Sequence, residues 1–461
     1  MHKSIAPIFS VAIAGLTGCS ALLNPELPEI QDIPDEIDVT KFGNNCEDDT
    51  TCGGYVCRSN RCTSTCASNS DCANEDISEC GASGMCTFKF PAAVPDPSIG
   101  FLYVGPTGDH GWTKTHEDSR QYLEQNISGI TTQFEPTVNP ANAAQVMQTF
   151  IDQGNNIIVG TSFDFLVPIQ TMAANNPNVN FLLCSGFTST PNLGSYFGRM
   201  YQVMYMMGII AARQTRTGHV GIVGPVIIPE TVRHANAFAQ GVRSVDPTVQ
   251  VHIEWVQKWF DPPVEAAMTD RLIEQADTDI IFGFTDTLIP MRTACGADES
   301  PCPRRTTTSS VPVFALGYDN PDSCSFVPDR CLASAYWNWG PRLERIINDM
   351  KAGTWDPSQL VWDQIRGTPD LSMAYISVNE AIVPNDVQID AEAAISSLTP
   401  NTEEARMFPF LGGMTDSRGN VRYEPGEIPT DAELLRMCWL ADNIFMADGR
   451  PGEAPGCVGD N

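Results

Sequence analysis

The sequence predicts an α/β protein built from two similar lobes, and three observations lead to this fold class. From residue 98 onward, short apolar runs alternate with amphipathic stretches, the pattern of parallel strands joined by crossover helices. The same pattern starts again after residue 218. Between the two copies, Met204–Gln214 is apolar almost all round, which predicts a helix buried between layers. We therefore expect two βα lobes joined by a hinge, with a cleft between them.

The elements of the first lobe follow in chain order. Strands are expected at three short apolar runs, Ile99–Val104, Ile157–Gly160 and Asn180–Cys184. Helices are expected over Trp112–Asn126 and Leu166–Asn175, which belong to the amphipathic stretches between these runs.

The second lobe is expected over roughly residues 218–335 of a binding domain that spans 98–448, with 449–461 as a tail. Its pattern repeats that of the first lobe. The expected strands are His219–Val223, Val249–Trp255, Asp279–Phe282 and Val313–Leu316, and the expected helices are Glu230–Val245 and Val264–Gln275.

The start of the chain has the pattern of a bacterial lipoprotein precursor. A cationic start and an apolar stretch lead to Leu16-Thr17-Gly18-Cys19, which predicts a signal peptide over residues 1–18 and a mature protein that begins at Cys19. The sulfur of Cys19 would carry a diacylglycerol and anchor the protein to the bilayer. The alternative is a plain secretory signal with an incidental cysteine. Either signal predicts an extracytoplasmic protein.

The membrane that holds this anchor is suggested by the next residue. Ser20 stands where an aspartate for inner-membrane retention could have stood, so resemblance to bacterial lipoproteins slightly favours the outer membrane, on its periplasmic or surface face. Residues 19–45 are rich in Pro, Asp, Glu and Asn, which predicts a flexible tether.

Cysteine spacing predicts a small module and three local crosslinks. Eight of the sixteen cysteines fall in residues 46–86, in two four-cysteine units that each open with a C-x5-C step, which indicates a disulfide framework. Zinc is the alternative, although the segment has neither a C-x2-C step nor histidine. Residues 87–97 then form a proline-rich linker. Three local disulfides are expected, and they pair Cys295 with Cys302, Cys324 with Cys331, and Cys438 with Cys457. Cys184 is expected to be a buried free thiol.

Composition excludes several classes of function. With 27 Lys+Arg against 56 Asp+Glu, the formal charge of −29 opposes binding to nucleic acid. The sequence lacks a P-loop, a G-x-S-x-G and an H-E-x-x-H motif, so we expect no enzyme and no cofactor. The i,i+6 spacing of His110 and His116 does not place both rings on one helix face, so no metal pair is expected. Paired carboxylates of a hydrolase stay possible, because their separation depends on the fold.

Aromatic residues and carboxylates recur just past the expected strands of both lobes. Ligands of open α/β sheets bind at the carboxyl ends of strands, so these side chains would face the cleft. Aromatics would stack on a planar ligand and acids would accept its N–H or O–H donors; alternatively, the aromatics fill the core and the acids cap helices. The candidate ligand-binding residues from this pattern are Asp109, Trp112, Phe163, Asp164, Trp259, Asp261, Asp286 and Asp319.

Several motifs, in their order and spacing, resemble the basic membrane protein family of substrate-binding lipoproteins, which includes purine nucleoside receptors. The motifs are Gly108–Trp112 with His116, Asn236–Arg243, Trp259–Pro262, Gly317–Asp319, Ala335–Trp339 and Lys351–Trp355. The resemblance covers residues 98–448 and implies the type I periplasmic binding fold, in which two lobes close on a ligand that is handed to an ABC permease.

The resemblance also implies roles for single residues. Trp112 and Trp259 match positions that place rings against a purine, Asp109 lies in a ligand-contacting loop, and Asp319 matches an acid that meets the ribose. The sequence departs from nucleoside receptors near Trp337, where those proteins have a lysine that reaches the sugar. A purine nucleobase is therefore as consistent with the sequence as a nucleoside, and Trp337 joins the candidate site.

These observations favour a lipid-anchored protein that captures a purine-like ligand by cleft closure and presents it to an ABC permease. The alternative is a cell-surface receptor, sensor or adhesion lipoprotein in which the cysteine module of residues 46–86 binds a partner.

Overall fold

The structure is a computed structural model that describes residues 91–457, apart from residues 187, 297–299, 399 and 401, and short pieces before residue 91. Those pieces include two short hairpins, β1 (Val56–Arg58) with β2 (Arg61–Thr63) and β3 (Ser78–Cys80) with β4 (Cys86–Phe88). Cys80 is disulfide-bonded, as the expected framework requires. The predicted signal peptide, Cys19 and the tether lie outside the described residues. No helix in the described part is long and apolar enough to cross a membrane.

The first lobe is a parallel sheet with the strand order β15-β9-β8-β7-β5-β6. Its strands are β5 (Ser98–Leu102), β6 (Thr131–Glu135), β7 (Ile157–Gly160), β8 (Asn180–Cys184), β9 (Leu193–Gly198) and β15 (Val361–Asp363). Its helices are α1 (Trp112–Asn126), α2 (Ala143–Asp152), α3 (Leu166–Asn175) and α8 (Gly340–Ala352), which packs on α1.

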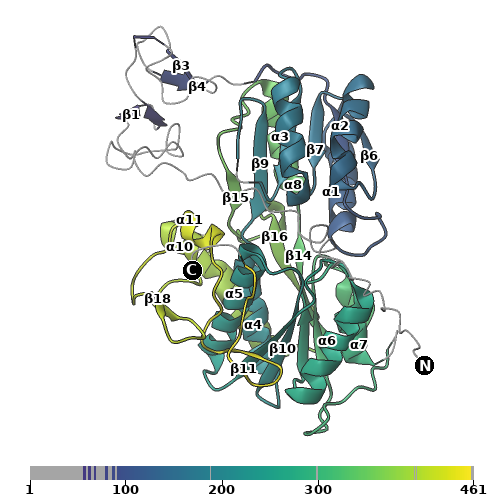
Figure 1. The fold of residues 1–461 in the computed structure, drawn as a ribbon, viewed down its shortest axis with the longest axis vertical. Coiled ribbons are helices and arrows are strands. Elements are labelled where there is room, and N and C mark those ends of the chain that lie inside the picture. Colours follow the sequence, from purple (N-terminus) through teal and green to yellow (C-terminus); the bar gives the residue numbers. More distant parts are fainter. Residues whose placement is uncertain are drawn as a thin grey trace, which may run out of the picture.

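The second lobe is a sheet with the strand order β16-β14-β13-β12-β10-β11-β19, in which β16 alone runs antiparallel to its neighbour. Its strands are β10 (His219–Gly224), β11 (Gln250–Trp255), β12 (Ile280–Gly283), β13 (Phe314–Gly317), β14 (Cys331–Trp337), β16 (Ala374–Val378) and β19 (Ile444–Met446). Its helices include α4 (Met200–Gln214), α5 (Pro229–Val245), α6 (Pro262–Gln275), α7 (Ile289–Cys295) and α9 (Asn385–Leu398). Figure 1 shows the two lobes with β14, β15 and β16 at their junction.

The predicted two-lobed α/β fold is confirmed, and every strand and helix expected from the sequence is present. The helix bounds of α1 and α3 and the strand bounds of β7 and β8 are those that the sequence predicts. Sequence reasoning missed β6, α2, β9 and β15 in the first lobe. The strand β6 carries no fully buried residue, so it lacks the apolar run that marks a central strand.

The second lobe extends past the expected limit of residue 335. Strand β14 continues to Trp337, and β16 and β19 join the same sheet from much later in the chain. The expected tail of residues 449–461 is partly built onto this lobe, because the Trp255 indole N–H donates to the carbonyl of Glu453 at 2.8 Å. A disulfide between Cys438 and Cys457 also holds it. Strand pairing between distant segments is a tertiary property that local patterns do not show.

The long apolar helix α4 is buried as predicted, and it begins four residues earlier than the sequence pattern suggested. Helix α5 crosses it in direct backbone contact. A Cβ added to Gly208 would lie 2.2 Å from the carbonyl oxygen of Phe238, and a Cβ added to Gly241 would lie 2.0 Å from that of Tyr205. Glycine is therefore required at both crossing positions.

The three predicted local disulfides are confirmed. They join Cys295 to Cys302, Cys324 to Cys331, and Cys438 to Cys457. Cys184 is a buried free cysteine, as expected.

Candidate functional site

The loops that follow the parallel strands of the two lobes face each other at the junction. The loop after β5 contacts loops of the second lobe through Gly111. A Cβ added to Gly111 would lie 3.0 Å from the carbonyl oxygen of Asp286, which follows β12, and 3.2 Å from Oδ2 of Asp319, which follows β13. The two lobes therefore meet at the carboxyl ends of their strands, where open α/β sheets bind ligands.

An aromatic cluster lies at this junction, and it consists of Trp112, His116, Phe197, Trp337 and Trp339. Trp337 at the end of β14 and Trp339, two residues further, stack with centroids 4.5 Å apart and an interplanar angle of 12°. The Trp112 ring, at the start of α1, meets them edge-on at 5.7 and 5.4 Å. The ring centroids of His116 and Trp339 are 4.9 Å apart in a stacked arrangement, and those of Phe197 and Trp337 are also 4.9 Å apart. Both lobes thus contribute to one aromatic cluster, in which every ring except that of Trp112 is buried.

Hydrogen bonds fix the orientation of Trp112 in this cluster. Its indole N–H donates to the carbonyl of Thr161, just past β7, at 2.8 Å. Nδ1 of His116 lies 3.0 Å from the carbonyl of Trp112, and complete burial lowers the pKa of His116 to about 3. The imidazole is therefore neutral, and Nδ1 carries the proton that it donates to Trp112.

Asp319 is the most unusual polar group of the junction. It is 0% exposed, and neither carboxyl oxygen has a hydrogen-bond partner. Burial, followed by repulsion from Asp286, raises the pKa of Asp319 well above its usual range. The indole N–H of Trp337 lies close enough to oppose this rise, although without hydrogen-bond geometry. The backbone of Asp319 has a φ of 64°, a left-handed conformation that Asp and Asn tolerate better than most residues.

Other acids surround Asp319. Asp286 is half-buried, and its backbone N–H donates to the carbonyl of Trp259 at 3.0 Å. Burial, and then the charge of Asp109, raises the pKa of Asp286 well above its usual range. Burial also raises the pKa of Glu230, at the start of α5, to about 7, an effect that Arg233 opposes. The junction therefore disfavours anionic ligands.

The carboxylates of two predicted site acids, Asp109 and Asp261, accept hydrogen bonds at the starts of helices. The carboxylate of Asp109 accepts the backbone N–H groups of Gly111, Thr113 and Lys114, each at 3.0 Å. It therefore shapes the loop that reaches the second lobe. The carboxylate of Asp261 caps α6 and accepts from Lys258 at 2.8 Å, so it has the helix-cap role that was the alternative for these acids.

The remaining predicted residues lie outside the aromatic cluster. Trp259 is half-buried and contributes its carbonyl to Asp286, but its ring contacts none of the cluster rings described. Phe163 packs against the first-lobe core. Asp164 stands at the surface of its turn, and desolvation nevertheless raises its pKa. The structure thus brings Trp112, Trp337 and the acids Asp286 and Asp319 together, with the loop of Asp109 beside them.

Sequence reasoning missed several contributors to this junction, among them Trp339 and Glu265. Trp339 lies inside the Trp-x-Trp motif, so its spacing from Trp337 could have revealed it. Glu265 had no local signal. Its fully buried carboxylate accepts the hydroxyls of Thr285, at 2.9 Å, and Thr287, and the backbone N–H of Asp261 at 2.8 Å. Glu265 therefore ties together the loops after β11 and β12.

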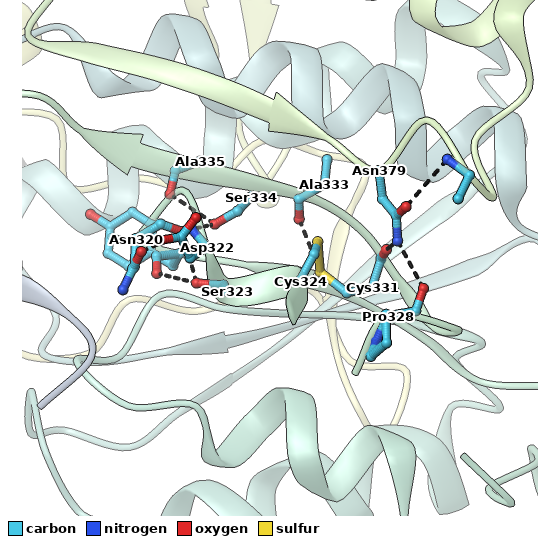
Figure 2. The surroundings of a disulfide bond; sticks show 12 residues. Asn320, Asp322, Ser323, Cys324, Pro328, Cys331, Ala333, Ser334, Ala335 and Asn379 are labelled. Atoms are coloured by element: carbon cyan, nitrogen blue, oxygen red, sulfur yellow. Dashed lines mark hydrogen bonds between the residues drawn. A yellow bond between two sulfur atoms is a disulfide. The ribbon is translucent and has the colours of Figure 1, made fainter. Parts of the chain in front are cut away.

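The disulfide between Cys324 and Cys331 supports the loop that carries Asp319. Figure 2 shows this disulfide beside Asn320, Ser323 and Ser334. The hydroxyls of Ser334 and Ser323 donate to the carbonyl of Asn320 at 2.7 and 2.9 Å. Asn320, the residue after Asp319, is therefore held by hydrogen bonds from residues on both sides of the crosslinked segment.

Two α/β lobes whose strand ends meet around aromatic and acidic side chains define the class of periplasmic-type solute-binding proteins. Residues 97–368, more than half of the chain, match the family described as ABC transporter substrate-binding protein PnrA-like. The chain belongs to this family. It is accordingly an extracytoplasmic substrate-binding protein of the ABC transporter type and not an enzyme.

Relatives agree with this assignment, and a solved structure agrees with the fold. The chain is 30% identical over 351 residues to a purine-binding protein of Brucella abortus, covering 76% of this chain and 91% of the relative. It is 28% identical over 285 residues to a putative ABC transporter glucose-binding protein of Haloferax volcanii, covering 61% and 68%. A solute-binding protein from Aeropyrum pernix shares the fold, with a TM-score of 0.54, 17% identity and coverage of 66% and 94%.

Proposed function

We propose that this protein binds a purine nucleobase or nucleoside between its lobes and delivers it to an ABC permease. The observation that carries the proposal is the unpaired, buried carboxyl group of Asp319 beside the aromatic cluster. A buried carboxyl group without a partner is unfavourable, so a ligand that bonds to it gains free energy on binding. Purines combine a flat ring with N–H groups, which suits this pair of features.

The acidic surroundings of Asp319 narrow the ligand class further. The charged groups that act most strongly on it are Asp286, Asp109 and Glu230, all of its own sign. Phosphorylated ligands would be repelled, whereas neutral bases and nucleosides would not. The tryptophan at position 337 makes a nucleobase as suitable as a nucleoside. The purine-binding relative from Brucella supports the class, while the glucose-binding relative from Haloferax makes sugars the competing class.

The test is a titration of the protein, without its signal peptide and Cys19, with adenine, guanine, adenosine, guanosine and glucose. Calorimetry should show binding of at least one purine compound and none of glucose. Trp337→Leu should weaken purine binding several-fold to about tenfold, because stacking contributes about 0.5–1.5 kcal/mol beyond area burial. Trp439→Leu removes an indole from the C-terminal region and should leave affinity unchanged. Binding of glucose alone would refute the purine assignment.

Anchoring through an acylated Cys19 is part of the same proposal. The support is the lipobox in the sequence, and the predicted acyl chains would keep the binding domain at the membrane. Cys19→Ala in the full-length precursor should move the protein from the membrane fraction to the soluble extracytoplasmic fraction. Fractionation of outer and inner membranes would then test the slight preference for the outer membrane. Retention of Cys19→Ala protein in membranes would refute the lipid anchor.

A further inference from the structure

The carboxyl group of Asp319 lies at the contact between the lobes with neither oxygen bonded. Its Oδ2 is 3.2 Å from the position that a Cβ on Gly111 of the opposite lobe would take. The backbone carbonyl of Asp319 accepts the N–H of Trp337 at 3.3 Å, which keeps the carboxyl group beside the aromatic cluster. Most of the cluster is buried in this structure, so the lobes must separate to admit a ligand, and a ring that then stacked on the cluster would present an edge to Asp319.

The groups that face Asp319 make a fully ionised site unfavourable. Asp286 is the charge that acts most strongly on it, and both residues lie against Gly111, since the backbone carbonyl oxygen of Asp286 and Oδ2 of Asp319 are 3.0 and 3.2 Å from the same Cβ position. A fully buried carboxyl group beside a half-buried one cannot ionise at small cost while its neighbour is charged, so such a pair keeps one proton. The other titratable groups that act on this pair are Asp109, Asp164, Glu230, Glu265 and Tyr318.

Two basic side chains on helices that border the junction have other partners. Arg233 on α5 lies near Glu230, and the ammonium of Lys114 on α1 binds Asp118 at 2.5 Å. Glu265 is occupied by hydroxyl and backbone donors. Within the described part of the chain, a proton is therefore the simplest means of neutralising the Asp286 and Asp319 pair.

We propose that Asp286 and Asp319 hold one proton between them, and that the neutral carboxyl group of Asp319 recognises a ligand edge carrying a hydrogen-bond donor beside an acceptor. This inference rests on the proposed purine function and names the edge that the site reads. A neutral carboxyl group has an O–H donor next to a carbonyl acceptor, whereas a carboxylate only accepts. Adenine offers the matching pair, an amino N–H beside a ring nitrogen. Guanine can pair with either protonation state, so adenine is the discriminating probe.

The test compares adenine affinity of wild type, Asp319→Asn and Asp319→Gly by calorimetry between about pH 5 and about pH 9. Wild-type affinity should be highest at acidic pH and fall by up to about tenfold for each pH unit above the pKa of the pair, because one proton is linked to binding. Asp319→Asn carries a permanent donor beside an acceptor, so its affinity should not vary with pH. Asp319→Gly suits the left-handed backbone but lacks both groups, and should bind at least tenfold more weakly than Asp319→Asn.

Three results would overturn the inference. Wild-type affinity that is flat or rises with pH would show that the carboxylate binds the ligand. An Asp319→Asn protein that binds adenine as weakly as Asp319→Gly does would show the same. If purines bind the wild-type protein but either of these two results is obtained, the proposed function survives and only the shared proton is refuted. Failure of every purine to bind folded wild-type protein at any pH would refute the proposed function and this inference together.

Discussion

The contact between Gly111 and the second lobe allows closure of the junction to be tested directly. Gly111→Ala adds a methyl group 3.0 Å from the carbonyl oxygen of Asp286 and 3.2 Å from Oδ2 of Asp319. These distances are shorter than normal van der Waals contact, so the lobes must separate or the loops must shift. Overpacking of this kind costs about 1–3 kcal/mol, which corresponds to a roughly five- to 150-fold loss of ligand affinity if binding requires the closed contact.

The matched control for this substitution is Gly108→Ala in the same loop. A Cβ added to Gly108 has no atom within 4 Å, so its affinity for adenine should equal that of wild type. Calorimetry measures affinity, and thermal unfolding without ligand checks that both variants fold. The Gly111→Ala protein should unfold near the wild-type temperature, because opening the junction relieves the clash. Equal adenine affinity of Gly111→Ala and wild type would refute the role of this contact in closure.

Three further predictions concern the supports of the site. Removing the Cys324–Cys331 disulfide by serine substitution should weaken adenine binding more than removing Cys295–Cys302, which has the same sequence separation of 7 but does not flank Asp319; equal affinities would contradict this. Glu265→Ala should lower the free energy of unfolding by about 2–4 kcal/mol in denaturant titrations, because it leaves buried donors unpaired, whereas the exposed Glu274→Ala should change it by less than about 0.5 kcal/mol. The pKa of His116 is lowered to about 3 in the folded protein, so its neutral form stabilises the fold above about pH 6.5, and this contribution is lost as pH falls toward 3. Over that range, the difference in the free energy of unfolding between wild type and His116→Phe should shift in favour of the variant. A difference that stays constant with pH would refute this prediction.

The sequence was sufficient for the fold class and for most elements of the sheets. Strands β7 and β8 are fully buried, so each appears as an uninterrupted apolar run. Helix α1 begins directly after a loop that contains three glycines, although the face that it buries is mostly polar. Local disulfides were also predictable, because cysteines seven residues apart can meet within one loop. These features depend on neighbouring residues, which the sequence shows directly.

The candidate site was only partly predictable. The strand-end pattern correctly indicated that Asp286 and Asp319 lie at the same edge of one sheet, since β12 and β13 are adjacent. It could not separate these acids from Asp261, whose carboxylate caps a helix instead. Capping and ligand contact use the same residue type at the same place, and the hydrogen bonds that distinguish them form only in the folded chain.

The sequence by itself determined that this protein is a two-lobed α/β binding protein with aromatic and acidic residues after its strands. Only the tertiary structure decided which of these residues meet. It stacked Trp337 on Trp339, brought Gly111 of one lobe against Asp319 of the other, and completed the second sheet with β19 from residues 444–446. The physical reason is that periodicity and composition report each residue's burial, whereas contacts between residues far apart in the chain depend on how whole lobes pack.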